Sequence, residues 1–281
     1  MSDFVQQQNS ICDFATSDSW VILSPIEQSI KKKIEAVGIP LKDWDINIYR
    51  GVLTGCNEAF IIDSGKRDEI LANCQTEDER KRTAELIRPI LRGRDIKRYR
   101  YDWANMYLIA TFPSRHYDID RYPAVKQYLL SFGIERLEQT GKTHVINGEK
   151  VKARKKTNNK WFETQDSINY WEDFYKPKLF YADITQQLNF CICRDVMFCN
   201  NTTYFIATEN ELILEHLSKY LNSPLIDWYY RTLSVQLGDK AVRMFSIYVL
   251  AIPIPPIGKN DIYKAYNLNS SEIAYIENRE V

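Results

Sequence analysis

The feature that most restricts the fold of this chain is an irregular alternation of capped helical segments with short strand-like runs. Capping-box pairs precede apolar helical repeats at three places: Ser24 with Glu27, Thr76 with Glu79, and Thr208 with Glu211. Helices are therefore expected over 24–38, over 76–88 and after 211, with Pro224 interrupting the last. Runs rich in β-branched and aromatic residues predict strands within 46–53, 59–63, 105–111, 178–184, 190–193, 202–208 and 248–254. Because no regular strand–helix–strand spacing connects them, the sequence predicts a mixed α/β, that is α+β, fold.

Two further segments and the composition complete this outline. Residues 136–165 are the most polar stretch and are expected to form a long surface loop or a hairpin, and residues 260–281 a small helical tail. The chain has 281 residues, of which 44% are hydrophobic. It can therefore bury one large core or two modest ones.

The cysteines favour free thiols over a metal site. They are Cys12, Cys56, Cys74, Cys191, Cys193 and Cys199. Cys191 and Cys193 lie in a strand-like run, where alternation places both thiols on one face, and the paired spacing of a zinc site is absent. No run of eighteen apolar residues predicts a membrane span, and the N-terminus lacks the pattern of a signal peptide. Together these features predict a protein of the reducing cytoplasm that contacts no membrane.

No catalytic or metal-binding motif is recognisable in this chain. His116, His144 and His216 are scattered, without a partner nucleophile motif. Glu149 and Lys150 are adjacent, so they do not match the Glu-x-Lys spacing of a nuclease centre. The sequence therefore predicts no catalytic residue, no metal ligand and no cofactor in this chain.

Two basic clusters instead indicate a nucleic-acid surface. Lys plus Arg and Asp plus Glu both number 37, so the chain has no net charge. Residues 88–100 nevertheless carry six basic side chains and one acidic, and residues 150–160 carry six basic and none acidic. Aromatic residues follow both clusters, as expected where cations neutralise phosphates and rings stack on bases. The alternative is a solvated charged face.

Specific residues of these clusters are candidates for DNA contact. Arg92, Arg94, Lys97 and Arg98 are expected to form a patch on the DNA backbone, because phosphate contacts position a protein without reading sequence. Two loops carry side chains that can pair with base edges, or alternatively only with phosphates. Their candidate residues are Arg154, Lys155, Lys156, Asn158, Asn159, Lys160 and Trp161 in one loop, and Arg231, Gln236, Lys240 and Arg243 around Gly238 in the other.

A glycine-bracketed turn, RGVLTGCN over residues 50–57, has two open interpretations. Gly51 and Gly55 permit positive φ or a close approach of another backbone. Thr54 and Asn57 can hydrogen-bond the turn's own backbone, which gives an internally satisfied turn. The flanking Arg50 instead suggests a turn that approaches DNA, with Thr54 and Asn57 beside it.

Taken together, six blocks of the sequence resemble the TaqI-like C-terminal specificity domain. The blocks span roughly residues 20–280 in family order and read RGVLTGCNEAFIID, IRPILRGRDIKRY, KWFETQ with KPKLFYADI, CNNTTYFI, LSKYLNSPLIDWYYRTL with YVLAIPIPP, and IYKAYNLNSSEIAYIE. The resemblance implies a target recognition domain with twisted mixed sheets flanked by helices and a short C-terminal helical tail. It also implies sequence-specific recognition of double-stranded DNA for a bacterial, type IIG-like restriction-modification enzyme with adenine-specific DNA methyltransferase activity.

The resemblance also implies what the parent enzyme contributes. In the family a preceding Rossmann-like domain binds S-adenosylmethionine and holds an extruded adenine in an Asn/Asp-Pro-Pro-Tyr/Phe motif. That motif is absent here, so a methyltransferase domain in cis or a separate subunit is the expected partner, with magnesium required if a nuclease is fused. The expected domains are a linker over 1–20, the recognition domain over 21–257 and the tail over 258–281. An autonomous nuclease and a protein-interaction domain are the alternatives.

Overall fold

The middle of the molecule is an antiparallel sheet of four strands in the order β12-β10-β14-β2. The computed structural model describes residues 23–234, 236–237 and 240–279. The strand bounds are Phe190–Cys193 (β12), Lys178–Ala182 (β10), Thr203–Ala207 (β14) and Asn47–Arg50 (β2). Other segments cover both faces of this sheet, so alternate side chains of one strand enter two different cores. On β10, Phe180 packs in the first core, whereas Leu179 and Tyr181 pack in the second.

The first core lies between the central sheet and a second, mixed sheet in the order β13-β4-β7-β3. These strands are Phe198–Cys199 (β13), Ile87–Leu91 (β4), Met106–Ile109 (β7) and Ile61–Asp63 (β3). The short helices around them are α3 (Asn57–Phe60), α4 (Ser64–Ala72), α5 (Glu77–Leu86), α6 (Pro123–Leu130) and α7 (Ile134–Leu137). A parallel bridge between Val52 and Asn200 connects the ends of the two sheets. The interdigitated side chains of this core include Phe60, Ile90, Leu129 and Phe198.

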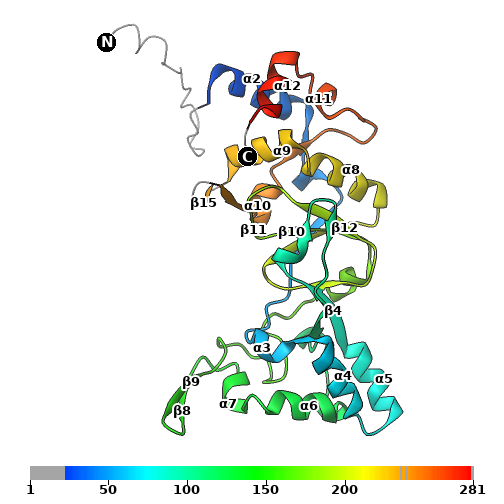
Figure 1. Cartoon of the computed structure of the whole chain (residues 1–281), viewed down its shortest axis with the longest axis vertical. Coiled ribbons are helices and arrows are strands. Elements are labelled where there is room, and N and C mark those ends of the chain that lie inside the picture. The colour runs from blue at the N-terminus through cyan, green and yellow to red at the C-terminus, as the bar shows by residue number, and fades with distance from the viewer. Residues whose placement is uncertain (1–22, 235, 238–239, 280–281) are drawn as a thin grey trace.

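The second core joins both ends of the described chain. Its helices are α2 (Pro25–Val37), α8 (Glu211–Leu221), α9 (Pro224–Leu233), α10 (Ser246–Val249), α11 (Ile262–Ala265) and α12 (Ser270–Glu277), and its small sheet pairs β1 (Ile39–Pro40) with β17 (Pro253–Ile254). The buried carboxylate of Glu272 on α12 accepts hydrogen bonds from Lys33 and Ser29 on α2, each at 2.7 Å. The expected helical tail therefore exists and packs directly on the first described helix. Figure 1 shows these helices at one end of an elongated molecule and α4–α7 at the other.

Three small sheets complete the described part of the fold. β5 (Ile96–Lys97) pairs with β6 (Arg100–Tyr101), β8 (Thr143–Ile146) pairs with β9 (Glu149–Lys152), and β16 (Ala241–Arg243) lies between β11 (Ile184–Thr185) and β15 (Gln236–Leu237). The β8–β9 pair confirms a hairpin within the polar segment 136–165. Its turn residues Asn147 and Gly148 both have positive φ, which suits a two-residue hairpin turn. The observed architecture confirms the expected mixed α+β fold.

Two of the three expected helix caps are confirmed. The Glu27 carboxylate accepts from the amide of Ser24 at 2.8 Å, and the Thr76 hydroxyl accepts from the amide of Glu79 at 3.1 Å. The expected cap at Thr208 is wrong, because Asn210 caps α8 by accepting from the amide of Leu212 at 3.0 Å. Helices α4 and α6 were not anticipated.

Free thiols are confirmed for the described cysteines. Cys56, Cys191, Cys193 and Cys199 are buried and Cys74 is half-buried, whereas Cys12 lies outside the described residues. Cys191 and Cys193 share one face of β12 and pack in the first core. Burial raises the pKa of Cys191 to about 12, so this thiol stays protonated at neutral pH. None of the described helices is long and apolar enough to cross a membrane. The expected linker, residues 1–20, also lies outside the described part.

Candidate nucleic-acid interface

An open groove lies beside the turn that carries Arg94, and we call it the Arg94 groove. It consists of two hollows of about 680 Å³ and about 510 Å³ that share Gly93, Arg94 and Ile184 in their walls. Its remaining polar lining consists of Arg92, Lys97, Asp183, Thr185, Gln186, Gln187, Asn189, Asn200, Thr202 and Lys240. Segments around residues 94, 186 and 240 therefore meet in one place, although they are far apart in the sequence.

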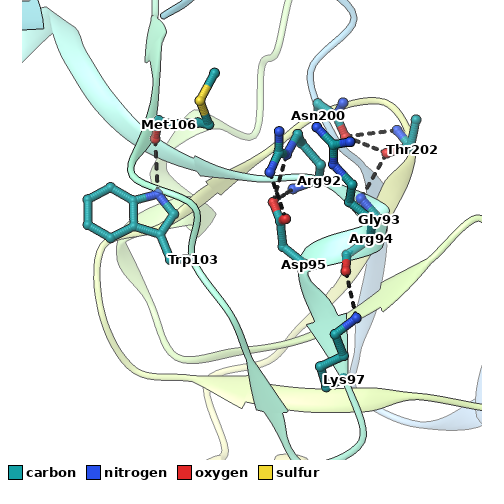
Figure 2. Close-up of polar contacts among 9 residues, drawn as sticks. All are labelled: Arg92, Gly93, Arg94, Asp95, Lys97, Trp103, Met106, Asn200 and Thr202. Carbon is teal, nitrogen blue, oxygen red and sulfur yellow. Dashed lines mark hydrogen bonds and ion pairs between the residues drawn. The ribbon is translucent and has the colours of Figure 1, made fainter. Parts of the chain in front are cut away.

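Arg92 stabilises the groove through contacts within the fold, and its guanidinium is already paired with a carboxylate. Its guanidinium forms a bidentate pair with the buried carboxylate of Asp95, with both N–O distances at 2.9 Å (Figure 2). The same carboxylate accepts from the Arg92 amide at 2.9 Å, and these bonds raise the pKa of Arg92. The pair fixes the 3-10 turn Gly93–Asp95, which leaves the side chain of Arg94 exposed.

Gly93 allows this turn to lie against the segment that follows β13. A Cβ at Gly93 would meet the Thr202 carbonyl oxygen at 2.7 Å, which any larger residue would have to displace. The amide of Gly93 donates to the Thr202 hydroxyl at 2.9 Å, and that hydroxyl in turn donates to Asn200 at 2.6 Å (Figure 2). The groove therefore has a rigid floor.

Lys97 and Arg98 diverge at the tip of the β5–β6 hairpin. Lys97 lines the groove and its Nζ donates to the carbonyl of Arg94 at 2.9 Å (Figure 2). Arg98 donates to the carbonyl of Asn222 at the end of α8, and its guanidinium lies 5.5 Å from the exposed ring of Tyr99. Of the expected patch, the structure thus brings Arg94 and Lys97 together in the groove and turns Arg98 towards α8.

The groove lining also contains amide side chains that were not predicted from the sequence. Gln186, Gln187 and Asn189 follow β11 and line the larger hollow together with Lys240. The signal in the sequence was a run of amides, TQQLN, directly after the strand-like run over 178–184. Gln236, expected to be a base-reading residue, belongs to β15, and Gly238 lies outside the described residues.

Arg231 connects this part of the groove lining to helix α9. Its Nε donates to Asp227 at 2.8 Å, its Nη1 donates to the carbonyl of Lys240 at 2.9 Å, and its Nη2 donates to the carbonyl of Gln186. Because all three nitrogens of the Arg231 guanidinium donate to acceptors within the fold, Arg231 is no longer a candidate for DNA contact. Arg243 is 38% exposed and pairs with Asp183 at 3.2 Å. That pair neutralises the carboxylate in the groove wall.

Polar side chains of the glycine-bracketed turn form hydrogen bonds within the turn itself. Thr54 is fully buried, and its hydroxyl donates to Asn57 Oδ1 at 2.7 Å and accepts from the Cys56 amide at 3.2 Å. A Cβ at Gly51 would lie 2.1 Å from the carbonyl oxygen of Asn200, and Gly55 has φ of 76°. Thr54 therefore leaves the candidate set, whereas Asn57 is exposed.

Arg154 is the clearest departure from the sequence-based expectation. Only 4% of this residue is exposed, and its guanidinium donates to four backbone carbonyls at 2.6–2.8 Å. Burial lowers the pKa of Arg154 to about 10, so the group stays charged at neutral pH. Its interactions with the fold occupy the donors that a DNA contact would need, and Arg154 is removed from the candidates.

The rest of the loop that contains Arg154 is accessible. Lys155, Lys156, Asn158 and Lys160 are exposed, whereas Asn159 donates to the carbonyl of Gln165 at 2.9 Å. Trp161 is half-buried against Phe162, with the ring centroids 5.6 Å apart.

Arg50 lies between this loop and the Arg94 groove. Its Nε donates to the carbonyl of Asn201 at 3.1 Å, and the neighbouring residues Asn200 and Thr202 line the groove. Burial raises the pKa of Asp166, and the nearby charges of Arg50 and Lys155 oppose that rise. Exposed cations therefore extend from the groove past Arg50 to Lys155.

Histidines and acidic residues do not assemble a metal centre in the part of the chain that the structure describes. No group of three or more His, Cys, Asp or Glu side chains is placed there to hold a metal ion. His216 Nε2 lies 2.7 Å from the carbonyl oxygen of Pro255, and burial lowers its pKa. This histidine is part of the packing of α8.

The comparisons with known proteins identify the family. The TaqI-like C-terminal specificity domain matches residues 88–254, a range that includes Arg94, Lys97, Gln186 and Lys240. The chain belongs to this family. No curated protein matches it.

Two solved structures resemble this member of the family. The type IIG restriction endonuclease BpuSI has a TM-score of 0.53 and 13% identity, over 90% of this chain and 28% of that one. The type IIL restriction-modification enzyme MmeI, solved in complex with DNA, has a TM-score of 0.49 and 12% identity, over 85% of this chain and 28% of that one. The likeness to BpuSI supports the fold. The chain spans little more than a quarter of either enzyme.

Proposed function

We propose that this specificity domain recognises double-stranded DNA for a restriction-modification enzyme and reads base edges in the Arg94 groove. The observation that carries the proposal is the meeting of three cations, Arg94, Lys97 and Lys240, with the amides of Gln186, Gln187 and Asn189 on one open surface. Arginine and lysine pair with guanine O6 and N7, and glutamine and asparagine pair with adenine N6 and N7. The groove holds both kinds of donor.

The availability of Arg94 supports a role in reading bases. Its exposed guanidinium forms no hydrogen bond or ion pair with any residue that the structure describes, whereas Arg92 and Arg231 are held by carboxylates. Among the residues that the structure describes, the one carboxylate that lines the groove, Asp183, is paired with Arg243. An anionic ligand would therefore meet uncompensated positive charge.

The cations beyond the groove suit the DNA backbone. Arg50, Lys155, Lys156 and Lys160 are exposed outside the groove, and Arg50 and Lys155 both lie near Asp166. Phosphate contacts position a protein along a duplex, and each one adds to the dependence of affinity on salt.

The parent enzyme that we propose is a bacterial, type IIG-like, adenine-specific DNA methyltransferase that acts in the cytoplasm. Support comes from the family membership and from the size of BpuSI, of which this chain covers 28%. The catalytic partner, in cis or as a separate subunit, would bind S-adenosylmethionine, and it would require magnesium if it also cuts DNA. For the described chain the proposed activity is binding alone.

The proposal is tested by fluorescence anisotropy after selection of a preferred duplex from a random pool. Arg94→Ala and Gln187→Ala should each relax preference at one base position, by about 1–3 kcal/mol per good bidentate contact. Lys264→Ala is the matched control, because Lys264 is 85% exposed and lies on α11, away from the groove. Equal effects of Lys264→Ala and Arg94→Ala would contradict the proposal.

Two controls separate the alternatives. Cleavage of the duplex in magnesium by the purified chain would instead support an autonomous nuclease. Absence of any salt-sensitive binding to duplex DNA would support a protein-interaction domain, since phosphate contacts release counterions.

A further inference from the structure

A second, smaller pocket is formed by arginine and aromatic side chains and shares no lining residue with the Arg94 groove. It lies where α5 and β4 meet the 3-10 helices Pro113–Arg115 and Trp171–Tyr175, in the half of the molecule that contains α4–α7 (Figure 1). Its cavity volume is about 120 Å³. The charged lining consists of Arg82, Arg88, Arg115 and Glu85, and the aromatic walls are Phe112, Tyr117, Tyr122, Trp171, Tyr175 and Phe198.

Within the described part of the chain, the guanidinium groups in this pocket have no anionic partner. Those of Arg88 and Arg115 make no hydrogen bond or ion pair with the residues that the structure describes. Arg82 donates one long bond, 3.3 Å, to the carbonyl of Arg121, and its Nε is buried without a partner. Three guanidiniums against the single carboxylate of Glu85 leave a net charge of +2 in the pocket. Like charges that line one pocket repel one another, and an anion bound among them would relieve this repulsion.

Aromatic rings lie against two of these guanidinium groups. The Arg115 guanidinium lies 3.8 Å from the ring centroid of Trp171, and the Arg88 guanidinium lies 5.4 Å from that of Tyr175. Both rings come from the same short 3-10 helix. Stacking of this kind uses the face of the guanidinium plane, whereas hydrogen bonds to an anion use its edge.

The size of the pocket suits a single anionic group. Cofactor and drug-sized ligands occupy pockets of about 300–1,000 Å³, well above this volume. Arginine forks match the geometry of phosphate oxygens, and a phosphate monoester carries a charge near −2 at neutral pH. A phosphodiester carries only one negative charge and would leave part of the pocket's charge uncompensated.

We propose that the pocket formed by Arg82, Arg88 and Arg115 binds a phosphate monoester group, either as free phosphate or at the end of a phosphorylated molecule. The walls hold the guanidiniums in place before binding, and the anion accepts from their edges. This site is independent of the proposed reading of DNA in the Arg94 groove.

The test is titration of the full 281-residue chain with inorganic phosphate by isothermal calorimetry, against sodium chloride at equal ionic strength. The double variant Arg88→Gln, Arg115→Gln should bind phosphate about tenfold more weakly or worse, as expected when charge-assisted bonds are lost. Arg67→Gln is the matched control, because Arg67 also stacks on an aromatic ring, Tyr107 at 4.9 Å, and lies outside the pocket. Glu85→Gln should bind phosphate more tightly, because it removes the one repulsive charge.

Each arm of the experiment supports or overturns the proposal. Saturable phosphate binding that weakens in the double variant and strengthens in Glu85→Gln supports it, and the Glu85→Gln arm remains informative if the double variant fails to fold. No effect of phosphate beyond that of chloride overturns it. A duplex with 5′-hydroxyl ends that competes with phosphate for the wild-type pocket also overturns it, because the ligand would then be a backbone diester.

If a duplex without terminal phosphates binds the chain and does not compete with phosphate, this result supports a separate site for the monoester. A duplex that binds while phosphate does not would overturn this proposal and leave the DNA-recognition proposal standing. Comparing inorganic phosphate with 5′-phosphorylated DNA then distinguishes the free ligand from a phosphorylated end.

Discussion

Replacement of Arg154 by alanine should destabilise the fold without a specific loss of DNA contact. The side chain donates to the carbonyls of Leu137, Thr54, Glu163 and Trp161, at 2.8, 2.7, 2.7 and 2.6 Å. Of these acceptors, the carbonyl of Glu163 retains a second donor, Nε2 of Gln139 at 3.1 Å. The other three would lose their charged donor in a region where only 4% of Arg154 is exposed.

The magnitude follows from these three carbonyl groups. A buried polar group left without a partner costs about 1–3 kcal/mol. Water that enters the space left by the side chain will reduce this cost, so we take the lower end and expect a loss of roughly 3 kcal/mol. For a domain of this size that corresponds to a fall in Tm of about 6–12 °C.

The assay is thermal unfolding followed by circular dichroism, with Lys155→Ala as the matched control. Lys155 is adjacent in sequence and exposed, so its replacement should change stability by no more than about 0.5 kcal/mol. An Arg154→Ala protein with the Tm of the wild type and weakened binding to one DNA sequence would refute the reasoning. It would show that the guanidinium leaves its carbonyl partners to read DNA.

Three further predictions concern single positions. Gly51→Ala places a Cβ 2.1 Å from the Asn200 carbonyl oxygen and should destabilise by about 1–3 kcal/mol or more, measured by urea unfolding. Asn210→Ala should cost about 1 kcal/mol as a lost helix cap, whereas Thr208→Ala should cost less, in the same assay. Burial raises the pKa of Glu272, but its bonds from α2 and from its own helix start lower it below the usual 4.5 overall. The ionised Glu272 carboxylate therefore stabilises the fold above the usual pKa of 4.5, and this stabilisation is lost as the pH falls through its lower folded-state pKa. The difference in Tm between wild type and Glu272→Gln should accordingly shrink on acidification.

The helices and strands that could be predicted from the sequence are those whose pattern is contained within a few neighbouring residues. The cap at Ser24 and the break at Pro224 act within one helical turn, and both appear in the structure. The continuous apolar run of β10 reports burial on both faces, because its alternate residues enter two cores. Helix α4 was missed since its sequence, SGKRDEILA, has only two buried residues and little apolar periodicity.

The groove could not be predicted because no single segment contains it. Arg94, Gln187 and Lys240 are far apart in the chain and meet only through the packing of β11 and β16 against the turn at Gly93. The cations at two of these places could be predicted from their charge. The amides could not, since an uncharged polar residue in a loop carries no local signal of binding.

Charge density along the sequence indicated two basic segments, but it did not indicate which of their side chains are held within the fold. Within the first cluster Arg92 is held by Asp95, and within the second Arg154 is buried among backbone carbonyls. An arginine has five donors in a rigid fork, which suits it equally to organising loops that lack secondary structure and to binding an external anion. The distinction depends on whether buried acceptors surround the fork, and that depends on the fold. Arg94 is set apart because the bonds of its neighbours hold it at the surface, and its donors have no partner among the described residues. This makes it the first residue to test on DNA.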